Sequence, residues 1–195
     1  MGGRTFFTRL FFGEAATQKM LAGRKRRILN LPDRKLLAEA YLPAFAAEGG
    51  TILWVGCQAY TAEDYKMLEQ GGATVWTMDI DQDAARWGHP THHRTGDICE
   101  VDTLFADVMF DAIVCNGVLG YGADSVDQQS RALAAMAKIL RPDGRLLLGW
   151  NTDKIDDPVA AGLTRGLYVP AAFAGQPERV RFDEVTHVYD SFVRT

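Results

Sequence analysis

The sequence predicts an α/β fold, built on a doubly wound sheet that is mainly parallel and has an antiparallel last strand. Apolar runs of strand length recur at residues 51–55, 74–78, 110–115 and 145–150, and a glycine or a polar residue follows each of them. Stretches with helical spacing separate these runs. Strands that alternate with helices favour a parallel sheet, because right-handed crossovers place the helices on both of its faces.

The 195 residues are enough for one domain with a sizeable core. We expect residues 1–47 to form an N-terminal helical lid or appendage and residues 48–195 to form the main domain. The aromatic residues within 4–12 and the basic stretch GRKRR at 23–27 stand out in the first part. We expect the aromatics to pack over the main domain as a lid or to make a homodimer contact. An anionic membrane surface and a phosphate or nucleic-acid contact remain the alternatives.

The elements follow in order along the chain. A helical pattern begins at Asp33, contains Pro43 and stops at Gly49 and Gly50, which terminate helices strongly. Residues 51–55 (TILWV) are apolar throughout, as in a strand covered on both faces. Further helices are expected at residues 63–70, 83–87 and 128–140.

The C-terminal part predicts a different connection. Residues 179–182 and 186–193 have strand patterns but lie too close together for a crossover helix, so we expect an antiparallel pair at the edge of the sheet. Residues 152–176 are rich in small residues and predict a long irregular connection that overhangs the carboxyl ends of the strands.

Composition narrows the function. A formal net charge of −4 and a charged fraction of 24% do not indicate nucleic-acid binding. The cysteines Cys57, Cys99 and Cys115 have no CxxC spacing, which argues against a disulfide framework or a zinc site and favours the cytoplasm. No apolar run approaches the roughly 18 to 20 residues of a membrane span, so we expect no stable membrane insertion. The sequence predicts a small-molecule partner and no metal.

Polar residues and glycines follow several of the predicted strands. Ligands of open parallel sheets bind at the carboxyl ends of the strands, where the winding reverses. The turn after the first strand begins with Gly56, and we expect Thr61 to cap the next helix in a capping box with Asp64. Asp79 ends the second strand, where a carboxylate can accept both ribose hydroxyls of an adenosine. An ordinary surface aspartate is the alternative.

Five segments in this order resemble the successive motifs of class I S-adenosylmethionine-dependent methyltransferases. They are ILWVGC (52–57), TVWTMDID (74–81), TGDI (95–98), FDAIVCNGVLGYG (110–122) and AKILRPDGRLLLGW (137–150). The resemblance implies a Rossmann-like sheet of seven strands with an antiparallel last strand. It also implies S-adenosylmethionine as cofactor and methyl transfer as the reaction.

The resemblance assigns positions around the cofactor. The turn with Gly56, Cys57, Gln58 and Tyr60 would face its methionine end. Asp79 would bind the ribose, Ile80 the adenine face and Asp97, with Ile98 beside it, the adenine amino group. Asn116 and Gly117 would lie on the sulfonium side, near the substrate.

Three residues depart from the family pattern. Trp54 stands where an acidic residue is usual, and Gln58 and Tyr60 stand where further glycines are usual. We therefore keep two functions open. One is a methyltransferase that acts on an oxygen or nitrogen atom of a small molecule, and the other is a non-catalytic methyltransferase-like cofactor-binding or partner protein. An NAD-dependent oxidoreductase would need a G-x-G-x-x-G turn, which GCQAYT does not provide.

Two residues are candidates for catalysis. His187 lies on a late strand, and a histidine near neutral pKa would help if the nucleophile is a hydroxyl. Strand alternation places His187 and Tyr189 on one face and Asp190 on the other. The alternative is a structural histidine beneath the N-terminal lid. Tyr121, in the loop after Asn116, is a candidate wall of the substrate pocket.

Overall fold

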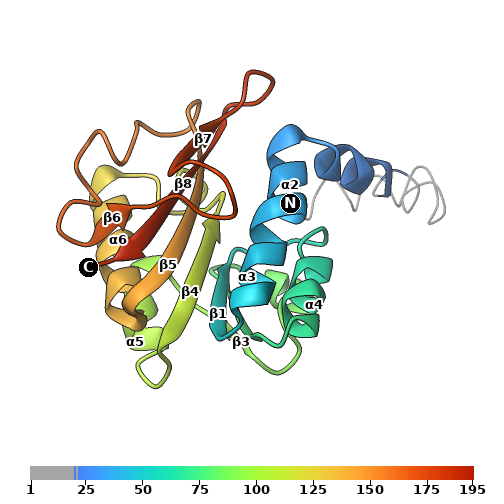
Figure 1. Cartoon of the computed structure of the whole chain (residues 1–195). Coiled ribbons are helices and arrows are strands. Elements are labelled where there is room, and N and C mark those ends of the chain that lie inside the picture. Colours follow the sequence, from blue (N-terminus) through green and yellow to red (C-terminus); the bar gives the residue numbers. More distant parts are fainter. Residues whose placement is uncertain (1–19, 21) are drawn as a thin grey trace.

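The computed structural model describes residue 20 and residues 22–195, in which helices flank both faces of one sheet (Figure 1). Residues 22–29, which contain the basic stretch, are helical. The aromatic residues within 4–12 lie outside the described residues. Their expected role as a lid or homodimer contact therefore stays a prediction, as does the membrane-surface alternative.

The strands of the described residues form one eight-stranded sheet in the order β3-β2-β1-β4-β5-β8-β6, with β7 also paired to β8. β1, β2, β3, β4 and β5 pair in parallel, and β8 is antiparallel to its neighbours β5, β6 and β7. The sheet is thus doubly wound and mainly parallel with one antiparallel strand, as predicted. The bounds are β1 (Thr51–Val55), β2 (Thr74–Asp79), β3 (His93–Thr95), β4 (Phe110–Asn116), β5 (Leu140–Asn151), β6 (Tyr168–Pro170), β7 (Arg179–Arg181) and β8 (His187–Arg194).

The strand count differs from the seven that the family resemblance implies. The predicted C-terminal pair exists as β7 and β8, but β8 does not form the edge of the sheet. The short strands β6 and β7 pair with successive parts of its outer side, at Phe192–Arg194 and at Val188–Asp190. β6 comes from the connection at 152–176, which is therefore not irregular throughout.

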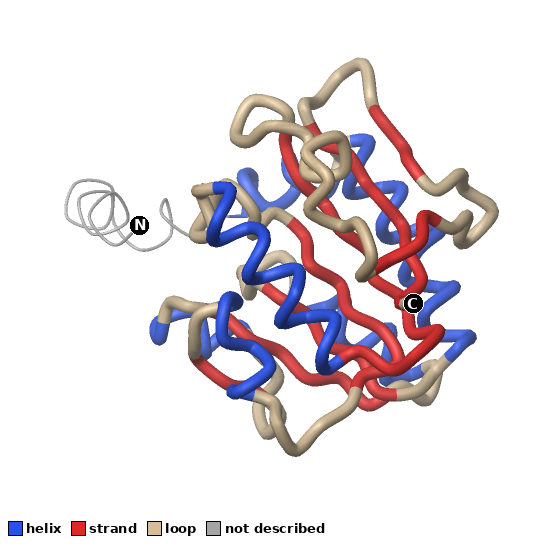
Figure 2. Tube along the Cα trace, turned by 90° about the vertical axis from the view of Figure 1, so that its left-hand side faces the viewer, coloured by secondary structure: helices blue, strands red, loops and turns tan. Residues whose placement is uncertain are grey.

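Helices cover both faces of the sheet, and Figure 2 shows the strands side by side with helices in front of them and behind them. The pattern that begins at Asp33 forms α2 (Pro32–Leu36), η1 (Leu37–Tyr41) and α3 (Leu42–Glu48), which lie on one face with α4 (Ala62–Gln70). The other face carries α5 (Val101–Leu104) and α6 (Val126–Ile139). Two short 3₁₀ turns, η2 (Gln82–Trp87) and η3 (Ile98–Glu100), complete the elements.

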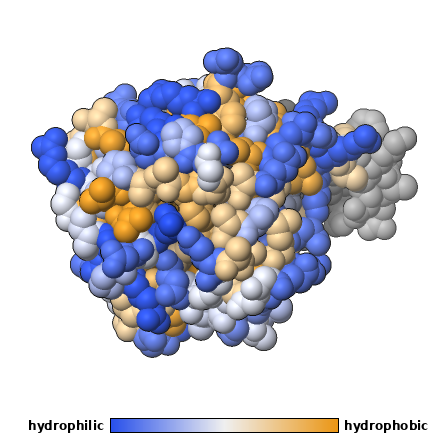
Figure 3. Space-filling view, in the orientation of Figure 1, coloured by the Kyte–Doolittle hydropathy of each residue, from blue (hydrophilic) through white to orange (hydrophobic). Residues whose placement is uncertain are grey.

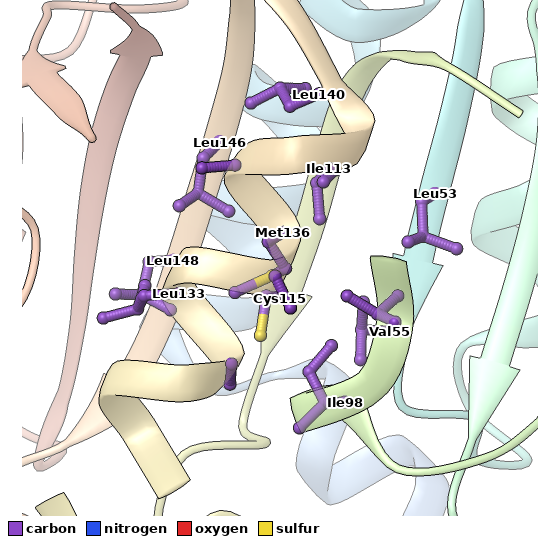
Figure 4. Close-up of a cluster of buried hydrophobic side chains, with 14 of the residues drawn as sticks. Leu53, Val55, Ile98, Ile113, Cys115, Leu133, Met136, Leu140, Leu146 and Leu148 are labelled. Carbon is purple, nitrogen blue, oxygen red and sulfur yellow. The ribbon is translucent and has the colours of Figure 1, made fainter. Parts of the chain in front are cut away.

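Strand alternation divides the core into two parts. Leu53 and Val55 of β1 point towards α6 and pack in the cluster that contains Leu133 and Met136 (Figure 4). Trp54, between them in sequence, points to the opposite face, where α3 and α4 contribute to the core. Both faces of β1 are therefore buried, which explains why its sequence is apolar throughout.

The helical segment before β1 widens ahead of Pro43. η1 is a π-helical turn, in which the N–H of Leu42 donates to the carbonyl of Leu37, five residues earlier. A proline has no N–H to donate, and its ring clashes with the carbonyl four residues before it, which here is that of Glu39. The wider turn relieves this clash, so the segment continues as a helix through Pro43.

The segment that we expected to be an appendage contributes to the core. Leu37, Tyr41 and Phe45 are all buried, in the same cluster as Trp54 of β1. The domain boundary at residue 47 stays a prediction. Residues 32–47 nevertheless supply part of the apolar surface that the sheet needs to bury on this face.

The surface that is visible in Figure 3 is mixed, with hydrophilic residues bordering a central band of hydrophobic ones. Among the described residues, none of the helices combines the length and the apolar character that a membrane crossing requires.

Candidate functional site

The carboxyl ends of β1, β2 and β4 meet at one edge of the sheet, where the winding direction reverses and where a cavity of about 440 Å³ opens. Segments that lie far apart in the sequence are adjacent there. Most of the predicted site residues line this cavity: Gly56, Gln58, Tyr60, Asp79, Ile80, Asp97, Ile98, Asn116, Gly117 and Tyr121.

Gly56 turns the chain from β1 into the edge of the cavity. Its φ of 89° lies in the left-handed region, which glycine adopts at no steric cost. A Cβ atom here would lie 3.3 Å from Cγ2 of Val118. The N–H of Gly56 donates to the carbonyl of Met78 at 2.9 Å, so the turn stays paired with β2.

Asp79 is held by backbone groups on both sides of its carboxylate. The N–H of Cys57 donates to Oδ2 at 2.7 Å, and the N–H of Asp81 donates to Oδ1 at 2.9 Å. Each carboxylate oxygen has two lone-pair sites, so each can accept one further hydrogen bond. The carboxylate is therefore fixed in orientation and still able to accept a pair of neighbouring hydroxyls.

The predicted capping box of Thr61 and Asp64 is wrong. Thr61 directly precedes α4, but its side chain makes no cap hydrogen bond. Its hydroxyl instead accepts the N–H of Gln58 at 3.1 Å and lies 2.8 Å from the hydroxyl of Tyr65. The tight turn from Gln58 to Thr61 folds this side chain back towards Gln58, so Thr61 stabilises the turn at the cavity rather than the helix end.

Trp54 and Tyr60 depart from the family pattern but fit the local structure. The indole N–H of the buried Trp54 donates to the carbonyl of Gly56 at 3.0 Å. This hydrogen bond stabilises the turn after β1 from the core side. The ring of Tyr60 lies beneath the guanidinium of Arg34, with 5.3 Å from Cζ to the ring centroid, a cation–π geometry. Both residues line the cavity.

The opposite end of the cavity combines apolar surface with one carboxylate. Ile80 is 59% exposed, which is unusual for a large apolar side chain directly after a buried strand. Asp97 is oriented by the N–H of Cys99, which donates to its Oδ1 at 2.9 Å. Ile98 is buried beside it. This end can therefore contact a flat apolar ring and accept a hydrogen bond from its edge.

Asn116 and Tyr121 form the third side of the cavity. The Nδ2 of Asn116 donates to the hydroxyl of Tyr189 at 3.2 Å, and within the described residues its buried Oδ1 has no hydrogen-bond partner. Gly117 has a φ of 69°, so the loop leaves β4 through a conformation that suits glycine. Tyr121 is 56% exposed, and the ammonium of Lys154 lies 5.7 Å from its ring centroid.

The side chains of Cys57 and His187 do not line the cavity. Burial raises the pKa of the Cys57 thiol to about 11, and this thiol donates to the carbonyl of Met78. Cys57 therefore contributes only its backbone N–H, through Asp79. His187 is buried behind Asn151, whose Oδ1 lies 3.2 Å from its Nδ1. Burial, together with the charge of Arg34, lowers the pKa of His187 to about 3. A histidine with such a pKa is neutral at physiological pH and is a weak base.

Sequence reasoning missed part of the wall. Arg34 and Ile28 come from the N-terminal helices and line the cavity beside Arg24, the first basic residue of the stretch at 23–27. The basic stretch drew attention to Arg24 in the sequence, although not to its place in the cavity wall. Nothing in the local pattern pointed to Arg34, because its position depends on how α2 packs on the sheet.

The described residues contain no group of three or more histidine, cysteine, aspartate or glutamate side chains arranged to hold a metal ion.

Comparison with known proteins identifies the family. The family model described as "Methyltransferase domain" matches residues 53–148. No curated protein matches the chain.

Solved structures with the same fold are distant in sequence. A TehB-like methyltransferase from Corynebacterium glutamicum is 22% identical, with a TM-score of 0.64 over 93% of this chain and 100% of that one. The N-methyltransferase NodS from Bradyrhizobium japonicum is 22% identical, with a TM-score of 0.54 over 89% and 95%. A 1,6-didemethyltoxoflavin-N1-methyltransferase from Burkholderia thailandensis is 18% identical, with a TM-score of 0.56 over 91% and 90%. Residues 53–148 therefore form a methyltransferase domain, and the surrounding sheet has the fold of class I methyltransferases.

Proposed function

We propose that this protein is an S-adenosylmethionine-dependent methyltransferase that transfers a methyl group by in-line displacement to an oxygen or nitrogen atom of a small molecule. The observation that carries the proposal is the position and orientation of the Asp79 carboxylate. This carboxylate ends β2 inside the cavity, is oriented by the N–H groups of Cys57 and Asp81, and keeps free lone pairs for the ribose hydroxyls.

The cavity residues fit the other parts of the cofactor. Gly56, Gln58 and Tyr60 would contact the methionine end, to which Cys57 would contribute through its backbone. Ile80, Asp97 and Ile98 would hold the adenine, and Asn116 and Gly117 would lie near the sulfur. S-adenosylhomocysteine is bound in structures of NodS and of the 1,6-didemethyltoxoflavin-N1-methyltransferase, which supports this choice of cofactor.

The mechanism needs little proton chemistry from the protein. When bound, S-adenosylmethionine supplies an activated methyl group, and positive charge disperses during its transfer. The cavity residues would align the nucleophile with the methyl carbon and exclude water. Arg24 and Arg34 add positive charge to one wall, which suits the carboxylate of the cofactor or of an anionic acceptor.

The remaining assignments belong to the same proposal. We take the acceptor to be a small molecule rather than a nucleic acid, with Tyr121 at the entrance of its pocket. We also place the protein in the cytoplasm. The three buried cysteines, which form no disulfides with one another, support that compartment.

A thermal-shift titration tests the cofactor. S-adenosylmethionine and S-adenosylhomocysteine should stabilise the wild type, whereas NAD should not. A ligand at one hundred times its Kd adds about 2.7 kcal/mol to the free energy of unfolding, or roughly 5 to 10 °C at about 2 to 4 °C per kcal/mol. Asp79→Ala should abolish the shift.

Asp81→Ala is the matched control. It removes the same charge two residues further on, where the side chain caps η2 and does not line the cavity. Its shift should equal that of the wild type. Absence of any shift in the wild type would contradict the proposed cofactor. Binding without methyl transfer to any acceptor would favour the non-catalytic alternative.

A further inference from the structure

Arg34 of α2 lines the cofactor cavity and has few partners among the described residues. Its side chain is only 14% exposed, and its Nε forms a long ion pair, 3.5 Å from Oδ2 of the buried Asp33. A guanidinium has five N–H donors, and within the described residues none of those of Arg34 makes a hydrogen bond. Donors that are so far removed from water need an acceptor, and the cavity is where an acceptor can reach them.

Contacts on two sides locate the guanidinium of Arg34. Its Cζ lies 5.3 Å from the ring centroid of Tyr60, in the turn after β1. Burial lowers the pKa of His187 and raises that of Tyr189, and the charge of Arg34 lowers both, so the guanidinium also lies near these residues of β8. Asn151, which pairs with His187 at the end of β5, lines the cavity as well. Arg34 therefore lies between the turn that follows β1 and the carboxyl end of β5.

The start of α4 offers other donors for the carboxylate of the cofactor. Thr61 makes no cap hydrogen bond, and the N–H groups of Ala62 and Glu63 have no partner within the described residues. Tyr60 and Thr61, directly before them, line the cavity. Free N–H groups at the start of a helix bind carboxylates well. The methionine end of the cofactor can therefore bind beside this turn and leave Arg34 to another group.

The charges around Arg34 are positive on balance. Arg24 also lines the cavity, and Lys25 follows it in the helix at 22–29, which leads into α2 (dark blue in Figure 1). Asp33 is paired with Arg34. Burial raises the pKa of Asp64 to about 7, although the nearby charges of Arg34 and Lys25 lower it in part, so this carboxyl is only partly ionised at neutral pH. The two carboxyl groups therefore do not compensate the three cations.

The cofactor increases this imbalance. S-adenosylmethionine carries a sulfonium, an ammonium and a carboxylate, so its net charge is positive. The carboxylates of Asp79 and Asp97 lie at the adenosine end of the cavity. An acceptor beside Arg34 therefore meets a positive wall on one side and a positive cofactor on the other.

An anionic oxygen group matches these surroundings better than a neutral or cationic group does. A carboxylate or a phosphate can accept two parallel N–H bonds from one guanidinium. A hydroxyl or an amide oxygen would leave the charge of Arg34 uncompensated. An ammonium would be repelled by Arg24, Lys25 and Arg34.

The lining beside the arginines is apolar. Ile28 follows Arg24 by one helical turn, so both residues share the helix face that lines the cavity. The ring of Tyr60 lies beneath Arg34. A molecule with an apolar body next to its anionic group would contact both kinds of surface.

We propose that the methyl acceptor is a small molecule with a carboxylate or phosphate group, which Arg34 binds inside the cavity. The inference rests on the proposed methyltransferase function. Arg24, which is exposed, adds attraction for the same group. The anionic group fixes the orientation of the acceptor, and the atom that receives the methyl group lies elsewhere on the molecule, towards Asn116.

The test uses the full chain saturated with S-adenosylhomocysteine, so that only the acceptor side of the cavity is free. Two matched sets of fragments are compared by saturation-transfer NMR at pH 7.5: benzoate, phenyl phosphate, benzamide and benzylamine, and butyrate, butyl phosphate, butyramide and butylamine. In each set, the carboxylate or the phosphate should bind at least tenfold more tightly than the amide and the amine. The tighter of the two anions identifies the anionic group.

Arg34→Gln separates the acceptor from the cofactor. It should weaken binding of the anions at least tenfold and change the Kd of S-adenosylhomocysteine less than threefold. The same variant is titrated with 5′-methylthioadenosine, which lacks the amino-acid part of the cofactor. If Arg34→Gln loses S-adenosylhomocysteine but keeps 5′-methylthioadenosine, Arg34 binds the carboxylate of the cofactor, and the inference is wrong.

A second pair of variants does not depend on Arg34. Arg24→Gln should weaken binding of the anions several-fold, because Arg24 lines the cavity. Arg26→Gln is the matched control, since it removes the same charge from the same helix at an exposed residue that does not line the cavity, and it should change binding less than twofold. If Arg34→Gln fails to fold, as judged by circular dichroism, this pair decides.

The outcomes separate the two proposals. A wild type that binds no S-adenosylhomocysteine overturns the proposed function and this inference with it. If S-adenosylhomocysteine binds, equal binding of anions, amides and amines overturns the inference alone, and so does a preference for anions that survives both Arg34→Gln and Arg24→Gln. Absence of binding by every fragment would also contradict it.

Discussion

Asp79 and His187 are each oriented by hydrogen bonds with neighbouring groups. Two backbone N–H groups hold the carboxylate of Asp79, and Asn151 holds the ring of His187. The carboxylate of Asp79 also faces the cavity, so its remaining lone pairs are accessible to a ligand. Such preorganisation reduces the entropy lost when a ligand is bound and aligned.

His187 should make the stability of the protein depend on pH. Its pKa is about 3 in the folded chain and 6.5 when unperturbed, as in an unfolded chain. Below pH 6.5 the unfolded chain takes up a proton that the folded chain does not, so the free energy of unfolding falls, by about 2 kcal/mol at pH 5 relative to pH 8. The fall continues until the pH reaches about 3.

Urea unfolding at several pH values measures this effect. His187→Gln cannot titrate, so the stability difference between wild type and variant should shift by about 2 kcal/mol, in favour of the variant, from pH 8 to pH 5. Other titrating groups cancel in this comparison. A difference that stays constant with pH would show that His187 is not buried as a neutral ring.

At the scale of elements, α4 and α6 begin in different ways. Ser125 caps α6 through a complete capping box, in which its hydroxyl accepts the N–H of Gln128 and the Gln128 side chain accepts the N–H of Ser125. Thr61 before α4 has no such role, because its hydroxyl belongs to the turn at the cavity. A hydroxyl-bearing residue in the N-cap position therefore stabilises a helix in one case and the turn at the cavity in the other.

Ser125→Ala should lower the free energy of unfolding by about 1 kcal/mol, because it removes the cap of α6. Cofactor affinity should not change, since Ser125 lies outside the cavity. Urea unfolding and calorimetric titration with S-adenosylhomocysteine measure the two quantities. A loss of affinity larger than threefold would indicate that the stability of α6 affects the shape of the cavity.

Thr61→Val should lower both quantities. It keeps the shape of the side chain but removes the hydroxyl that bonds Gln58 and Tyr65, which costs about 1–3 kcal/mol of stability for buried partners. The turn at Gln58 also loses its support, so affinity for S-adenosylhomocysteine should fall several-fold. The same two measurements apply, and unchanged affinity would mean that the backbone alone maintains the turn.

At the scale of the whole molecule, a partly buried ion network joins the connection after β5 to strands β7 and β8. Asp190 of β8 is 2% exposed and accepts from the indole of Trp150 at 2.8 Å and from Arg179 of β7 at 2.5 Å. Arg179 also pairs with Asp157 in the connection after β5. The network thus links β5, β7, β8 and the connection on the face opposite His187, as strand alternation predicts for Asp190.

Asp190→Leu should be among the most destabilising substitutions. It leaves the guanidinium of Arg179 half-buried with one carboxylate fewer and the indole N–H of Trp150 without an acceptor, which should cost about 3–5 kcal/mol. Arg131→Ala is the control, because its exposed pair with Asp127 on α6 should contribute less than about 0.5 kcal/mol. Urea unfolding compares the two, and equal losses would contradict a special role for the network.

The sequence by itself determined the alternation of strands and helices between residues 51 and 151, and the residues that end most of these strands. Continuous apolar runs and helical spacing are local patterns, and parallel strands bring their carboxyl ends together, so Gly56, Asp79 and Asn116 were predictable as neighbours. The capping residues were less predictable. Thr61 and Ser125 look alike in sequence, and only the path of the preceding turn separates them.

Tertiary structure alone decided which side chains from distant segments share a space. Arg34 reaches the cavity because α2 packs across the sheet, and Gly149 lies between Asn116 and His187 because of the register of β4, β5 and β8. Register between strands is set by long-range packing, and a shift of one residue would reverse every side chain. The set of side chains that meet on this face is therefore a property of the assembled sheet and its covering helices, not of any single segment.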